Sequence, residues 1–68
     1  MAILKKNEIK EMSTEELINK VKELRMELQK LRLKKELGTL DNPGKIRAIR
    51  RTIARILTEL RSRGVKYD

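Results

Sequence analysis

Four arginines are the residues of this chain best suited to chemistry, and that chemistry is the binding of phosphate groups. Their spacing places them on one side of a helix, at Arg47, Arg50, Arg51 and Arg55. A guanidinium presents a planar pair of N–H donors that bind phosphate oxygens bidentately. A solvated helix face usually mixes both signs of charge, but positions 45–63 hold seven basic residues and one acid, Glu59. We therefore favour phosphate binding over a merely solvated face.

Six further candidates for phosphate binding lie at the ends of expected helices: Gly44, Lys45, Lys34, Lys35, Lys5 and Lys6. The start of a helix presents free backbone N–H groups, and Gly44 has no side chain to keep a phosphate away from them. Plain capping by Asn42 is an equally weighted alternative for this turn. Lys34 and Lys35 either belong to the same phosphate-binding surface as the four arginines or complement the dipole of the helix that precedes the turn.

The composition narrows the classes of function. The chain has 68 residues and a net charge of +8, which favours a polyanionic partner. It contains no Cys and no His, so we expect no disulfide, no thiolate or imidazole catalysis, and no metal or other cofactor. Without Phe or Trp it has no stacking platform for unpaired bases. The longest apolar run covers residues 1–4, so we expect a soluble intracellular protein without a membrane segment.

Two long helices must position the basic residues, because apolar residues recur with coiled-coil spacing. Residues 14–37 contain no Gly or Pro, and their apolar seam is Leu17, Val21, Leu24, Leu28 and Leu31. Residues 43–63 carry a second seam at Ile46, Ile49, Ile53, Ile56 and Leu60. The arginines fall on the back of this second seam.

Capping signals delimit both helices. Ser13 and Glu16 fit a capping box before the first helix, and Gly38 supplies the left-handed position that ends it. Asn42 and Pro43 are typical of the start of the second helix, which Gly64 ends.

The expected fold is all-α, a single domain over 1–68 formed by an antiparallel two-helix hairpin with coiled-coil-like packing. The link 38–42 is short enough to force the helices antiparallel. Residues 1–12 are expected to form a basic lead-in with one short helical turn capped by Asn7. Residues 64–68 form a tail in which Tyr67 and Asp68 fray.

A row of apolar residues lies roughly opposite the seam of the first helix: Met26, Leu33 and Leu37, with Leu40 beyond it in the turn. Such a row marks either a protein partner, an apolar surface of folded RNA, or ordinary scattered exposure. Ile3 and Leu4 raise the same question. Because so small a hairpin buries only one seam, an outside surface would help to stabilise it.

The second helix closely resembles the signature of the large ribosomal subunit protein twenty-nine family. Residues 42–58 read NPGKIRAIRRTIARILT, and the family pattern is an Asn-Pro start, I-R-x-[IV]-R-[RK]-x-I-A-R, and a Thr. Residues 8–17, EIKEMSTEEL, resemble the family's first segment, and Leu24, Glu27-Leu28 and Leu31-Arg32 continue the match to about residue 62. The chain departs at Leu33, where the family often has an aromatic. The opening MAILKK and the turn GTLDNP look archaeal.

This resemblance implies a two-helix hairpin that binds large-subunit ribosomal RNA near the exit of the peptide tunnel, within the cytoplasmic ribosome. It also implies contact with the neighbouring large-subunit protein twenty-three, which belongs to the docking platform for nascent-chain factors. The family's arginine positions carry over onto Arg47, Arg50, Arg51 and Arg55, all of which are present.

Two alternatives compete with a structural ribosomal protein. The first is a homodimeric hairpin, an interaction module with RNA-binding activity that uses Met26, Leu33 and Leu37 as a second seam. The second is a small helical enzyme of the chorismate mutase type, which requires Arg, Lys and Glu pointing into a cavity. The seams here contain only Val, Ile and Leu, so we expect no enzyme.

Overall fold

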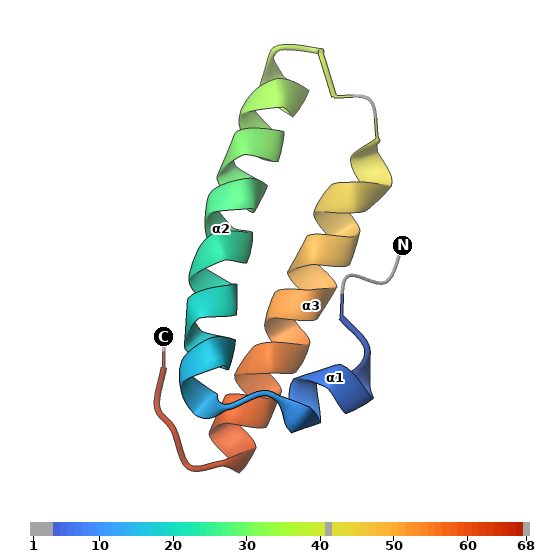
Figure 1. Ribbon diagram of the computed structural model, residues 1–68. Helices are drawn as coiled ribbons and strands as arrows, with labels where there is room; N and C mark the ends of the chain where they lie inside the picture. The colour runs from blue at the N-terminus through green and yellow to red at the C-terminus, as the bar shows by residue number, and fades with distance from the viewer. Residues whose placement is uncertain (1–3, 41, 68) are drawn as a thin grey trace.

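Three helices form the part of the chain that the computed structural model describes, residues 4–40 and 42–67 (Figure 1). They are α1 (Lys6–Glu11), α2 (Thr14–Glu36) and α3 (Pro43–Ser62). The boundaries of α2 and α3 agree with the predicted ranges 14–37 and 43–63 to within one residue. The predictions for Ile3 and Asp68 lie outside the described residues.

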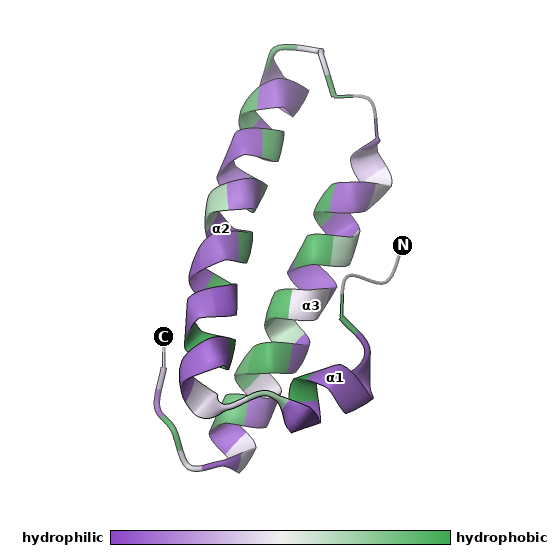
Figure 2. Cartoon of the chain, viewed as in Figure 1, coloured by the Kyte–Doolittle hydropathy of each residue, from purple (hydrophilic) through white to green (hydrophobic). Residues whose placement is uncertain are grey.

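The two long helices pack against each other as an antiparallel hairpin, and the whole structure measures 40 × 21 × 14 Å (Figure 1). Their apolar stripes face each other, and the outer sides are mostly hydrophilic, with some apolar residues on the outer side of α2 (Figure 2). All five predicted seam residues of α2 are buried, as are four of the five in α3, whereas Ile46 is half-buried. The predicted all-α hairpin is therefore confirmed, and none of the described helices is both long and apolar enough to span a membrane.

The ends of α2 and α3 are fixed by the expected local hydrogen bonds. Glu16 N donates to Ser13 Oγ at 3.1 Å and Ser13 N donates to Glu16 Oε1 at 3.3 Å, which completes the capping box. Gly38 has φ +73° and Gly64 has φ +79°, the left-handed conformation that glycine adopts without strain. The N–H of each glycine and the N–H of the residue after it donate to carbonyls in the last turn of the helix, which forms a Schellman motif.

Helix α1 is more than a lead-in, because it closes one side of the core. Ile9 is only 3% exposed, and Leu4 and Met12 pack beside it against the buried cluster. The prediction that Asn7 caps this helix is wrong: α1 begins at Lys6, and Lys5 occupies the N-cap position without a side-chain cap bond. A short helix without a cap depends on tertiary contacts, and those of α1 are mainly to α3.

The C-terminal tail also packs against the hairpin. It passes under the end of α3 and turns back along α2 (Figure 1). Val65 and Tyr67 are half-buried against the core, and the guanidinium of Arg25 lies 5.8 Å from the centre of the Tyr67 ring. The expectation that Tyr67 frays is therefore wrong. The expectation of a core limited to one seam is wrong as well, because α1 and the tail extend the core.

Candidate nucleic-acid interface

The outer side of α3 is the most basic surface of the hairpin. Its four predicted arginines are all exposed, at Arg47, Arg50, Arg51 and Arg55. They are exposed because the buried seam occupies a different side of α3. The guanidinium groups are thus available to an outside anion.

Three of these arginines and one predicted lysine line a single groove near the tip of the hairpin. This tip groove has a volume of about 540 Å³, and its charged lining residues are Lys35, Arg47, Arg50 and Arg51. Pro43, Ile46 and Ala54 complete the lining, which contains no acid. Tertiary packing therefore places the end of α2 beside the arginine face of α3, and the lining of the groove includes four basic residues.

Arg55 does not line the tip groove but a second hollow between α1 and α3. Lys6, another predicted site residue, lines the same hollow, and so does Lys10, which the sequence analysis did not single out. Lys10 could have been predicted as a neighbour of Lys6 from the sequence, because a spacing of four residues places both side chains on one face of a helix.

The remaining predicted residues have other surroundings. Lys45 forms an ion pair across the hairpin, with Nζ 3.6 Å from Glu27 Oε1. Gly44 N donates to Asn42 Oδ1 at 3.1 Å, so its N–H group serves the cap, as in the capping alternative. Lys34 is exposed at the end of α2, where it complements the dipole, and Lys5 is exposed just before α1.

A third hollow brings in an arginine that the sequence analysis missed. Arg25 of α2 and Arg50 of α3 face it from the two helices, over an apolar floor that includes Leu28 and Ile53. Arg25 lies in a helix of mixed charge, so charge pattern alone did not distinguish it. Its position between the seam residues Leu24 and Leu28 was the only signal that it borders α3.

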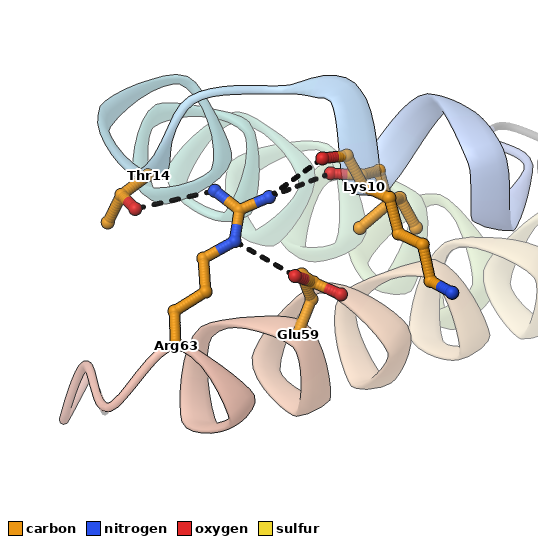
Figure 3. Close-up of polar contacts among 5 residues, drawn as sticks. Lys10, Thr14, Glu59 and Arg63 are labelled. Carbon is orange, nitrogen blue, oxygen red and sulfur yellow. Dashed lines mark hydrogen bonds and ion pairs between the residues drawn. The ribbon is translucent and has the colours of Figure 1, made fainter.

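Arg63 holds the elements of this surface together (Figure 3). Its Nη2 donates to the carbonyl oxygens of Lys10 at 3.1 Å and Ile9 at 3.4 Å, at the end of α1. Its Nη1 donates to Thr14 Oγ1 at 3.4 Å, and its Nε pairs with Glu59 Oε2 at 2.9 Å. The guanidinium thus supplies donors to two carbonyls at the end of α1, of which that of Ile9 also accepts the Met12 N–H, and it joins α1, α2 and α3.

The apolar row on the back of α2 is exposed as expected. Met26 is 60% exposed, Leu33 56% and Leu37 68%. Leu40 does not extend the row, because it is half-buried against the core. Leu4 is half-buried against the core as well, so it is not an exposed apolar residue. The row lies on α2 and the arginines on α3, each opposite the seam between the helices, so the two surfaces face different sides of the hairpin.

Fold and surface together define a small helical protein with a basic outer face. The family model described as Ribosomal L29 protein matches residues 7–63. Large ribosomal subunit protein uL29 of Caldanaerobacter subterraneus subsp. tengcongensis is 52% identical over 65 residues, which cover 93% of this chain and 98% of the relative. The corresponding protein of Methanococcus maripaludis strain S2 is 50% identical over 69 residues (100% and 97%), and that of Methanocaldococcus jannaschii 56% over 59 residues (85% and 84%). No solved structure matches.

The chain belongs to this ribosomal protein family, which confirms the resemblance of its helix signatures. It is a structural, non-enzymatic constituent of the large subunit of the cytoplasmic ribosome. Archaeal relatives are among the matches, in keeping with the appearance of its opening and its turn.

Proposed function

We propose that this chain binds large-subunit ribosomal RNA through the outer face of α3. The observation that carries the proposal is the tip groove, where Lys35, Arg47, Arg50 and Arg51 converge without an acid among the lining residues. Binding is electrostatic, because guanidinium and ammonium groups neutralise phosphates and release counterions. Shape and backbone contacts rather than base readout select the site, as is usual for folded RNA.

Within the subunit, the proposed location is near the exit of the peptide tunnel, next to large-subunit protein twenty-three and within reach of nascent-chain factors. The family resemblance suggests this location. The structure supports an arrangement with two partners, because the arginine face of α3 and the exposed row Met26, Leu33 and Leu37 of α2 point to different sides. One hairpin can then hold RNA on one side and a protein on the other.

The test is the salt dependence of binding to isolated large-subunit RNA. Changing Arg47, Arg50, Arg51 and Arg55 together to Gln removes four cations, and each phosphate contact contributes roughly 0.7–0.9 to the slope of log K against log salt. We expect a lower affinity and a slope reduced by about 2.8–3.6. The matched control changes Lys22 and Lys30 on the back of α2, and the effects are compared per charge removed. An unchanged slope in the arginine variant would refute the proposal.

A homodimeric interaction module remains the second candidate, and the exposure of Met26, Leu33 and Leu37 favours it. In such a dimer the three side chains would form a second seam between two hairpins. Sedimentation of the isolated chain at low and high concentration separates the candidates. A stable dimer would support the module, and a monomer would support the ribosomal docking surface.

A further inference from the structure

The hollow between α1 and α3 has the features of a ligand site. It has a volume of about 380 Å³, and its lining includes the cations Lys6, Lys10 and Arg55. We propose that this α1–α3 groove is a second binding site for the sugar–phosphate backbone of RNA, with these three side chains as its phosphate ligands. The inference rests on the proposed function and adds α1 to the RNA-binding surface.

The charges around the groove favour an anion. Lys6 and Lys10 lie four residues apart on one face of α1, and the acids of that helix, Glu8 and Glu11, do not line the groove. Glu59 is the single acid in the lining, and its carboxylate is bound at 2.9 Å by Arg63, which offsets its charge. Three cations therefore surround a hollow in which the acid is already paired.

The groove is formed before any ligand arrives. Ile9 anchors α1 in the core at 3% exposure, and Arg63 holds the last carbonyls of α1 from the end of α3. The side chain of Lys10 runs away from the Arg63 guanidinium, so the backbone of Lys10 holds the helix while its ammonium group stays outside that cluster (Figure 3). A preformed site loses less conformational freedom when it binds, which favours affinity.

The groove also continues the tip groove. Ala54 lines both hollows, and Arg51 in one lies a single helical turn from Arg55 in the other. From Arg47 to Arg55 the basic face spans about 12 Å at 1.5 Å per residue. A nucleic-acid backbone that occupies the tip groove can thus pass over Ala54 into the α1–α3 groove. This continuity favours RNA over an acidic protein segment as the ligand.

Two lysine variants of the full chain test the proposal on isolated large-subunit RNA. In Lys6→Gln/Lys10→Gln we expect the slope of log K against log salt to fall by about 1.4–1.8, and the affinity at 0.1 M salt to fall roughly 25- to 60-fold. Lys22→Gln/Lys30→Gln removes the same charge from the back of α2 and is expected to change both much less. Equal effects of the two variants would overturn the proposal.

Chemical footprinting of lysines provides a readout that needs no variant. Acetylation of Lys6 and Lys10 should slow when the protein is bound to the isolated RNA, whereas Lys22 and Lys30 should react as in the free chain. Protection of Lys6 and Lys10 only in the whole subunit would indicate a protein in the groove and would overturn the proposal. If the four-arginine variant loses its salt dependence and the lysine variant does not, the α1–α3 groove alone is refuted. If the salt dependence changes in neither variant, both the α1–α3 groove and the proposed function are refuted.

Discussion

Arg63 is predicted to be the residue whose loss most selectively loosens α1. Its guanidinium makes four polar contacts, two of 2.9 and 3.1 Å and two of 3.4 Å, with groups on α1, α2 and α3. The side chain is 23% exposed and that of its partner Glu59 is 20% exposed, so water screens these contacts only in part. Arg63→Met keeps the apolar stem and removes every donor.

The expected loss of stability is about 2 kcal/mol. Hydrogen bonds to charged groups contribute roughly 1.5–3 kcal/mol when they are well formed, but two of these contacts are long, and the released carbonyls regain water. For a domain of this size, about 2 kcal/mol lowers the melting temperature by roughly 8–16 °C. Thermal unfolding followed by circular dichroism measures this shift.

Two further measurements distinguish the loss of the Arg63 contacts from the general effect of removing a positive charge. Arg61→Met removes an exposed cation from the same end of α3, and we expect it to change stability by less than about 0.5 kcal/mol. Amide hydrogen exchange in α1 should accelerate in Arg63→Met more than exchange in the middle of α2, because only α1 loses its anchor. Equal melting temperatures for the two variants, or unchanged exchange in α1, would refute this account of Arg63.

Four other changes test local features of the fold by chemical or thermal unfolding. Ser13→Ala removes the capping box and should lower the free energy of unfolding by about 1 kcal/mol; an unchanged stability would mean that the reciprocal bonds do not form in solution. Gly64→Ala forces a Cβ into a left-handed position at φ +79° and should cost about 1 kcal/mol; an unchanged stability would contradict the assigned conformation. Ile56→Val, at a fully buried position, should cost about 1 kcal/mol. Leu33→Ser should leave stability within about 0.5 kcal/mol, and a large loss would show that the apolar row is buried in the isolated chain.

Local sequence was sufficient to predict the two long helices and their inner and outer faces. Caps act over three or four residues, as between Ser13 and Glu16, and the seam follows from helix periodicity alone. The same periodicity placed Arg47, Arg50 and Arg51 on the exposed side of α3, where the structure has them.

The features that the sequence did not predict depend on residues far apart in the chain. Arg63 reaches Ile9 and Lys10 across more than fifty positions, and no local pattern encodes such a contact. The same holds for Tyr67, which packs on the hairpin beside Arg25 instead of fraying.

The basic surface shows the same division. By itself, the sequence determined which residues carry the positive charge and on which side of a helix they lie, because both follow from residue type and a period of 3.6. Only the tertiary structure decided which charges share a groove. The docking of α1 set Lys6 and Lys10 beside Arg55, and the antiparallel packing set Lys35 beside Arg47, since these neighbours belong to different helices.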